Sequence, residues 1–262
     1  MEEQIKIETV NPAEMLQREK ASYDVQIATA KQYPRDVKRA TDNAVATISM
    51  SKEMAESCGY ALPRGGKPIT GPSVHLARIL SQYWGNLRVE SRVVDITHSQ
   101  VVSQSVCFDL ENNVAVKVEV RRSIVGKHGR YSDDMITVTG NAANAISFRN
   151  AVFNVIPKAV VDKAYRAAQN VITGDLSSED KLTKARVNAV NFFKENFSAT
   201  EEEICRAAGV NSINAINQNE IVLLGGLKQA LADGDTTPDE AFERKSKDKA
   251  AEKIKKDVQQ KL

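Results

Sequence analysis

Hydrophobic positions change their spacing twice along the chain, from a helical pattern to strict alternation and back again. Residues 13–32 and 35–58 are rich in Ala, Lys, Glu and Gln, and Pro34 separates them, which predicts two N-terminal helices. From residue 87 onward β-branched residues dominate, and every second residue from 114 to 120 is a valine. Alternation of this kind predicts a strand that buries one face and leaves the other polar.

Three strands are predicted in this part of the chain, over residues 87–96, 99–110 and 114–125. Short polar stretches rich in Asn, Ser and Thr separate them, so we expect an antiparallel meander. A basic turn at residues 126–134 is expected to lead into a short further strand at residues 135–138.

A long helix is predicted after the meander, from about residue 141 to residue 156, and it resumes beyond Pro157 to about residue 172. Its apolar stripe has the spacing of a core-facing side and consists of Ala142, Ala145, Ile146, Val152, Phe153 and Ile156. Arg149 projects from the middle of that stripe. It is therefore either buried and paired with a carboxylate such as Asp133 or Asp134, or exposed to a groove where it can bind a phosphate.

Residues 173–177 predict a linker, and the chain beyond them has helical spacing again to about residue 242. Gly209 lies in a turn between two short helices, which fits either a helix-turn-helix or a small protein-binding module. The acidic charge of this segment opposes phosphate and favours the protein-binding module. The lysine-rich tail from Arg244 has few apolar residues, so we expect a frayed helix or disorder there.

These patterns together predict an α+β fold. We expect an antiparallel β-meander packed on a long helix, a β-β-β-α core, with N-terminal helices and a C-terminal helical module. The predicted parts are an N-terminal helical segment, the core, an acidic helical module and a basic tail, at residues 1–59, 60–174, 175–242 and 243–262.

Charge is distributed unevenly between these parts. Residues 60–172 carry 14 basic and 8 acidic side chains, a net charge of +6, whereas residues 173–242 carry 6 and 12, a net charge of −6. The excess of positive charge predicts that the central part of the chain binds a polyanion.

The sequence contains no signature of catalysis or of cofactor binding. A phosphate-binding P-loop would need glycine at Ala61 and a hydroxyl residue at Pro68. The three histidines and three cysteines have no metal-ligand spacing, and there is no run of about 20 apolar residues. We therefore expect a cytoplasmic protein that is not an enzyme, has no catalytic residue, metal site or cofactor, and is not a membrane protein.

A family resemblance covers about residues 58–172. The stretch RGGKPITGPSVHLARILSQYWGN precedes the strands, and GRYSDD and a helix with ISFRNAVFNVIPK follow them. This order resembles the single-strand annealing proteins, the superfamily of the eukaryotic repair annealase Rad fifty-two and the phage recombinases of the RecT, Redβ and Erf groups. The most specific residues are Gly65, Gly66, Lys67, Gly71, Leu76, Ala77, Trp84 and Gly85. The distal LLGGLKQALADGDTTPDEAF also looks like the C-terminal part of phage recombinases.

The resemblance implies ATP-independent binding of single-stranded DNA and annealing of complementary strands in recombination and repair, by a phage or prophage protein. It implies homo-oligomeric rings or helical filaments, with a host single-strand binding protein or a companion exonuclease as partner of the acidic module. The strand is expected in a groove between meander and helix, with candidate contacts at Arg64, Lys67, Lys117, Arg121, Arg122, Lys127, Arg130, Arg149, Lys158, Lys163 and Arg166. Two alternatives stay open, a metal-dependent nuclease of a recombination pathway and a non-enzymatic phage structural or scaffold protein.

Overall fold

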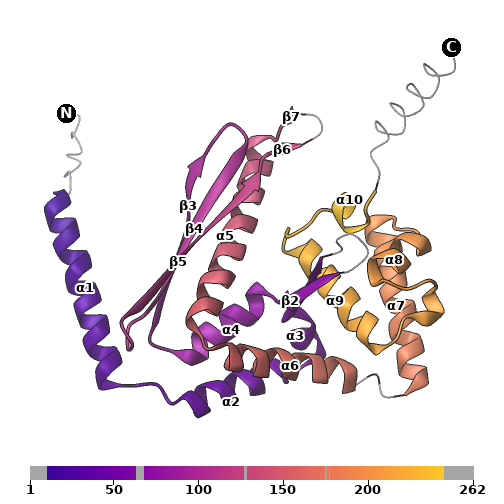
Figure 1. Cartoon of the computed structure of the whole chain (residues 1–262), viewed down its shortest axis with the longest axis horizontal. Helices are drawn as coiled ribbons and strands as arrows, with labels where there is room; N and C mark the ends of the chain where they lie inside the picture. Colours follow the sequence, from indigo (N-terminus) through magenta and orange to yellow (C-terminus); the bar gives the residue numbers. More distant parts are fainter. Residues whose placement is uncertain (1–10, 63–67, 127–128, 175, 177, 245–262) are drawn as a thin grey trace, which may run out of the picture.

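Helices and small antiparallel sheets make up this α+β chain (Figure 1). The computed structural model describes residues 11–62, 68–126, 129–174, 176 and 178–244. Its elements are α1 (Pro12–Gln32), α2 (Val37–Ile48), α3 (Lys52–Ser57), β1 (Gly59–Leu62), β2 (Ile69–Pro72), α4 (Val74–Trp84), β3 (Leu87–Ile96), β4 (Gln100–Asp109), β5 (Val114–Ser123), β6 (Val125–Gly126), β7 (Gly129–Arg130), α5 (Asp133–Val155), α6 (Lys158–Gly174), α7 (Glu179–Phe197), α8 (Glu201–Ala208), a 3₁₀ turn (Ile213–Ala215), α9 (Gln218–Ala232) and α10 (Pro238–Ala241).

The antiparallel meander is confirmed, with the strand order β3-β4-β5. Helix α5 packs on one face of this sheet (Figure 1). The hydroxyl groups of Ser103 and Ser105 on β4 lie 2.9 and 2.7 Å from the Ser147 hydroxyl on α5. Gly140 allows the close approach, because a Cβ there would lie 3.2 Å from a methyl group of Val93. Among the described elements, no helix covers the opposite face of the sheet as α5 covers this one.

Helices α2, α3, α4 and α6 form a layer at one end of the sheet, beneath it in Figure 1. Their apolar stripes meet the lower half of α5 and enclose a core that is built mainly of Ile48, Leu76, Leu80, Trp84, Val152, Ile156, Val161 and Ile172. This core joins the start of the meander to the end of α5, with Leu87 and Val89 of β3 packed against it.

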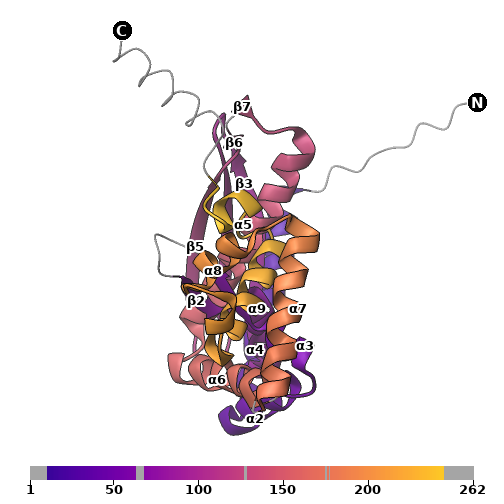
Figure 2. The ribbon, with the colours of Figure 1, turned by 90° about the vertical axis from the view of Figure 1, so that its right-hand side faces the viewer.

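The C-terminal helices enclose a second core and lie on the opposite side of the molecule from α1 (Figures 1 and 2). Helix α9 packs on strand β1 with almost no side chain between them. A Cβ at Gly226 would lie only 2.8 Å from the backbone carbonyl carbon of Tyr60 and 2.9 Å from the nitrogen of Ala61. Ala61 is fully buried within this second core. The β1–β2 hairpin therefore links the C-terminal module to the rest of the chain.

Three expectations about local structure are wrong. The expected helix over residues 35–58 is divided, because Ser51 caps a separate helix, α3, with its hydroxyl accepting from the Met54 N–H. Residues 135–138 form the first part of α5 rather than a strand, because Ser132 caps a helix that begins with Asp133. Strands β1 and β2 form a hairpin that we did not expect.

Two local signals in the sequence coincide with helix boundaries. Ser73 caps α4 at Val74, with its hydroxyl accepting from the two N–H groups of His75 and Leu76. The predicted interruption at Pro157 separates α5 from α6. None of the described helices is both long enough and apolar enough to cross a bilayer.

Candidate nucleic-acid interface

The sheet face opposite α5 presents charged side chains from its two outer strands. Because paired residues in an antiparallel sheet point to the same side, the register places residues of all three strands together on this face. We call this surface the open sheet face, and it consists of Arg88, Glu90, Arg92 and Asp95 on β3, Val102, Gln104, Val106 and Phe108 on β4, and Lys117, Glu119 and Arg121 on β5.

Only half of the basic groups on the open sheet face are neutralised by a carboxylate. Arg88 Nε lies 2.6 Å from Glu90 Oε1, and Arg121 Nη2 lies 2.8 Å from Glu119 Oε1. Arg92 and Lys117 are exposed, and neither has a carboxylate partner among the described residues. These two cations lie on opposite outer strands, separated by about 10 Å across the sheet from the usual strand spacing and by a further two residues along it, because Arg92 pairs with Gln104 and Lys117 with Val106.

The middle strand offers a less polar path between the two cations. Gln104, Val106 and Phe108 are partly exposed along it. At its end the ring of Phe108 lies 6.1 Å from the ring of Tyr23 on α1, and the Arg88 guanidinium lies over Tyr23 at 4.0 Å. Cations beside an apolar and aromatic path are the elements with which proteins bind single strands without reading their sequence.

Helix α1 is held beside this face by a buried ion pair at the α1–α2 junction. Arg35 donates to both carboxylate oxygens of Asp109 at 2.6 Å, and both side chains are 5% exposed. Glu111 accepts from the Arg35 backbone N–H at 3.0 Å and from Asn86 at 2.9 Å. Burial alone would raise the pKa of Asp109, but hydrogen bonds from Arg35 and Asn112 outweigh it and hold this pKa below its usual value.

The predicted groove between meander and helix stays a prediction for the described residues. Helix α5 lies directly against β3 and β4 through the serine contacts and Gly140, so no strand of DNA fits between α5 and these two strands. Of the predicted contacts, Lys117 and Arg121 lie on the open sheet face. Arg64, Lys67 and Lys127 lie outside the described residues.

The remaining predicted contacts lie at three separate places. Arg130 donates to the backbone carbonyls of Thr97 and His98 at 2.8 and 2.5 Å, at the turn between β3 and β4. Arg122 and Arg149 face the C-terminal module. Lys158, Lys163 and Arg166 are exposed along α6, where Asp162 and Asp42 of α2 partly neutralise them.

Arg149 is a buried ion-pair residue in this structure, as one of its two expected roles requires. Its partner is Asp235 rather than Asp133 or Asp134, with Arg149 Nη1 3.6 Å from Asp235 Oδ2 and the two side chains 12% and 9% exposed. Its guanidinium also lies over the Tyr60 ring at 4.5 Å, and its Nε donates to Asn150 Oδ1 at 3.2 Å.

Sequence reasoning missed Arg88, Arg92, Tyr23 and Phe108. The outward position of Arg92 could have been predicted from the alternation of the strands. A meander register that places Lys117 on the outer face also places every second residue of the first strand there. The aromatic contact had no such signal, since it joins α1 to β4 across 85 residues of sequence.

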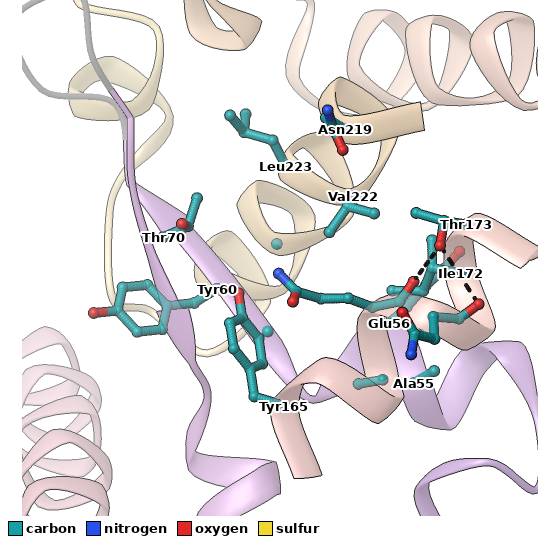
Figure 3. Close-up of a pocket in the computed structure, with 15 residues that line it drawn as sticks. Ala55, Glu56, Tyr60, Thr70, Tyr165, Ile172, Thr173, Asn219, Val222 and Leu223 are labelled. Atoms are coloured by element: carbon teal, nitrogen blue, oxygen red, sulfur yellow. Dashed lines mark hydrogen bonds between the residues drawn. The ribbon is translucent and has the colours of Figure 1, made fainter. Parts of the chain in front are cut away.

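A cavity of about 460 Å³ lies between α3, α6, α9 and the β1–β2 hairpin. Figure 3 shows Tyr60, Thr70, Tyr165 and Asn219 around it. Among the described residues its lining includes one carboxylate, Glu56, and no basic side chain, so this chemistry does not suit a phosphate. Across the described part of the chain, no three His, Cys, Asp or Glu side chains gather closely enough to hold a metal ion.

The cysteines offer no reactive thiolate. All three are buried and free of disulfides. Burial raises the pKa of Cys58 to about 11 and that of Cys107 to about 12, so both thiols are protonated at neutral pH. Comparisons with protein-family models, with curated proteins and with solved structures found no match to this chain.

Proposed function

We propose that this chain binds single-stranded DNA on the open sheet face and anneals complementary strands without ATP, in recombination and repair. The observation that carries the proposal is a pair of exposed cations, Arg92 and Lys117, on either side of the partly apolar middle strand, neither with a carboxylate partner in the described part of the chain. In this arrangement phosphates contact the outer strands, while Gln104, Val106 and Phe108 support the bases. Sequence is then read by base pairing between the two DNA strands.

The β-β-β-α unit formed by the meander and α5 is the DNA-binding core in this proposal, and several copies act together as a ring or filament. Two features support self-association. Strands β3 and β5 are both edges of their sheet, and each spans 10 residues. Helix α1 exposes Met15, Leu16 and Val25 by 58%, 68% and 65%. We propose that the acidic C-terminal module recruits a host single-strand binding protein or a companion exonuclease.

Binding of a short fluorescent oligothymidylate as a function of salt concentration tests the proposal. Each phosphate that the protein neutralises on a single strand contributes about −0.7 to the slope of log K against log [salt]. Arg92 and Lys117 alone therefore predict a slope of about −1.4 or steeper. Absence of binding at low salt, or binding that does not depend on salt, contradicts the proposal.

A further inference from the structure

The loop between α9 and α10 places Asp235 against basic side chains of α5 and β5, and Asp233 beside His75 of α4. We call Asp233, Gly234 and Asp235 the aspartate loop. Arg149 Nη1 lies 3.6 Å from Asp235 Oδ2, and Arg122 Nη1 donates to the Asp235 backbone carbonyl at 3.2 Å. The loop packs closely on α5, because a Cβ at Gly234 would lie 3.6 Å from the Cβ of Ala142. Both arginines thus contact the same acidic residue of the C-terminal module, Asp235.

The carboxylates of this loop make few good hydrogen bonds in the docked position. The Arg149–Asp235 pair is too long for a hydrogen bond at 3.6 Å, although the Asp235 side chain is only 9% exposed. Asp233 Oδ1 accepts from Gln229 at 3.0 Å and lies 3.1 Å from His75 Nε2, but its buried Oδ2 has no hydrogen-bond partner among the described residues. Carboxylates that lose water without gaining good hydrogen bonds are held weakly.

The pKa of Asp235 is consistent with a weak contact between this carboxylate and Arg149. Burial raises the pKa of Asp235 above its ordinary value, and the nearby charge of Arg149 only partly offsets this effect. The charged carboxylate is therefore more stable in water than against the two arginines.

A phosphate group fits the two arginines better than the loop does. A guanidinium binds phosphate oxygens through parallel N–H donors at hydrogen-bond distance, which the Asp235 carboxylate does not achieve here. The Tyr60 ring and Asn150 already fix the orientation of the Arg149 guanidinium, so little side-chain freedom would be lost on binding.

We propose that Arg122 and Arg149 form a second phosphate site that Asp235 occupies in the free protein, so that the C-terminal module restrains DNA binding until a strand displaces the aspartate loop. This inference rests on the proposed function, because the competing ligand is the backbone of single-stranded DNA. It assigns the acidic module a regulatory contact with the core in addition to any partner it recruits.

The test is the affinity of full-length Asp235→Asn for a short fluorescent oligothymidylate at fixed salt. We expect binding about 3- to 10-fold tighter than that of the wild type, with a slope against salt that is steeper by about 0.7 for one additional phosphate. Glu195→Gln is the matched control, because it removes one exposed carboxylate from the same module, away from the two arginines. It should change the affinity by less than about 2-fold.

A double-mutant cycle makes the test specific to the arginine site. Arg149→Ala combined with Asp235→Asn should lose the gain in affinity, because the freed site no longer exists. A gain in affinity no larger than that of Glu195→Gln, or a gain that persists without Arg149, overturns the inference. Binding by the wild type would still support the proposed function in that case. Failure of the wild type and of every variant to bind overturns both.

Discussion

Asp109→Ala should lower the free energy of unfolding by about 3–5 kcal/mol, because it leaves the terminal nitrogens of a buried guanidinium without acceptors. The Arg35 side chain is 5% exposed, and Glu111 Oε2 lies 3.2 Å from its Nε without forming a hydrogen bond to that nitrogen. The measurement is urea unfolding of the wild type and variant at neutral pH. A loss below about 1 kcal/mol would show that the pair does not hold the α1–α2 junction.

Asp162→Ala is the matched control for that experiment. It removes an aspartate from an ion pair in which the Lys158 side chain is 85% exposed, and exposed pairs contribute less than about 1 kcal/mol. The two variants together separate the effect of burial from the loss of one negative charge.

The same pair predicts how stability depends on pH. Because the folded pKa of Asp109 lies below its unfolded value of about 3.9, the ion pair contributes fully above that value. Its contribution is lost as the pH falls through the folded pKa. The difference in stability between wild type and Asp109→Ala should therefore shrink in acid, and a constant difference from pH 7 downward would contradict this assignment.

Charge reversal at the two unpartnered cations of the open sheet face should weaken DNA binding by roughly 100-fold. The double variant Arg92→Glu with Lys117→Glu removes two phosphate contacts and adds two repulsive carboxylates, together about 3 kcal/mol. Both side chains are exposed, so the variant should unfold close to the wild-type temperature. The measurement is oligothymidylate affinity, with the slope against salt flatter by about 1.4.

Lys184→Glu with Lys194→Glu is the control with the same change in net charge. Both residues are exposed on α7, in the C-terminal module. If this control weakened binding as much as the sheet variant, the effect would come from total charge, and the open sheet face would not be the interface.

Regular elements of the fold could be predicted from local pattern, whereas the contacts between distant segments could not. The three strands follow from alternation, and the α4 start and the break between α5 and α6 follow from Ser73 and Pro157. The first turns of α5 were predicted as a strand because β-branched residues there favour one. The Ser132 cap and packing on the sheet stabilise a helix instead.

The candidate site was predictable only in part, for the same reason. A basic central segment pointed to a polyanion, and alternation along β5 identified Lys117 and Arg121 as outward-facing. The partner of Arg149 lies 86 residues away in a loop, where no periodicity connects the two. Which face of the sheet α5 covers depends on tertiary packing, so the open sheet face could not be identified from the sequence.

Annealing of two complementary labelled oligonucleotides without ATP is the decisive measurement for the proposed function. Quenching of a donor on one strand by an acceptor on the other reports the rate of pairing, with and without the protein, at low salt. The account predicts faster pairing than the spontaneous rate, an acceleration that the Arg92→Glu and Lys117→Glu double variant loses. Pairing at the spontaneous rate in the presence of folded wild-type protein would contradict it.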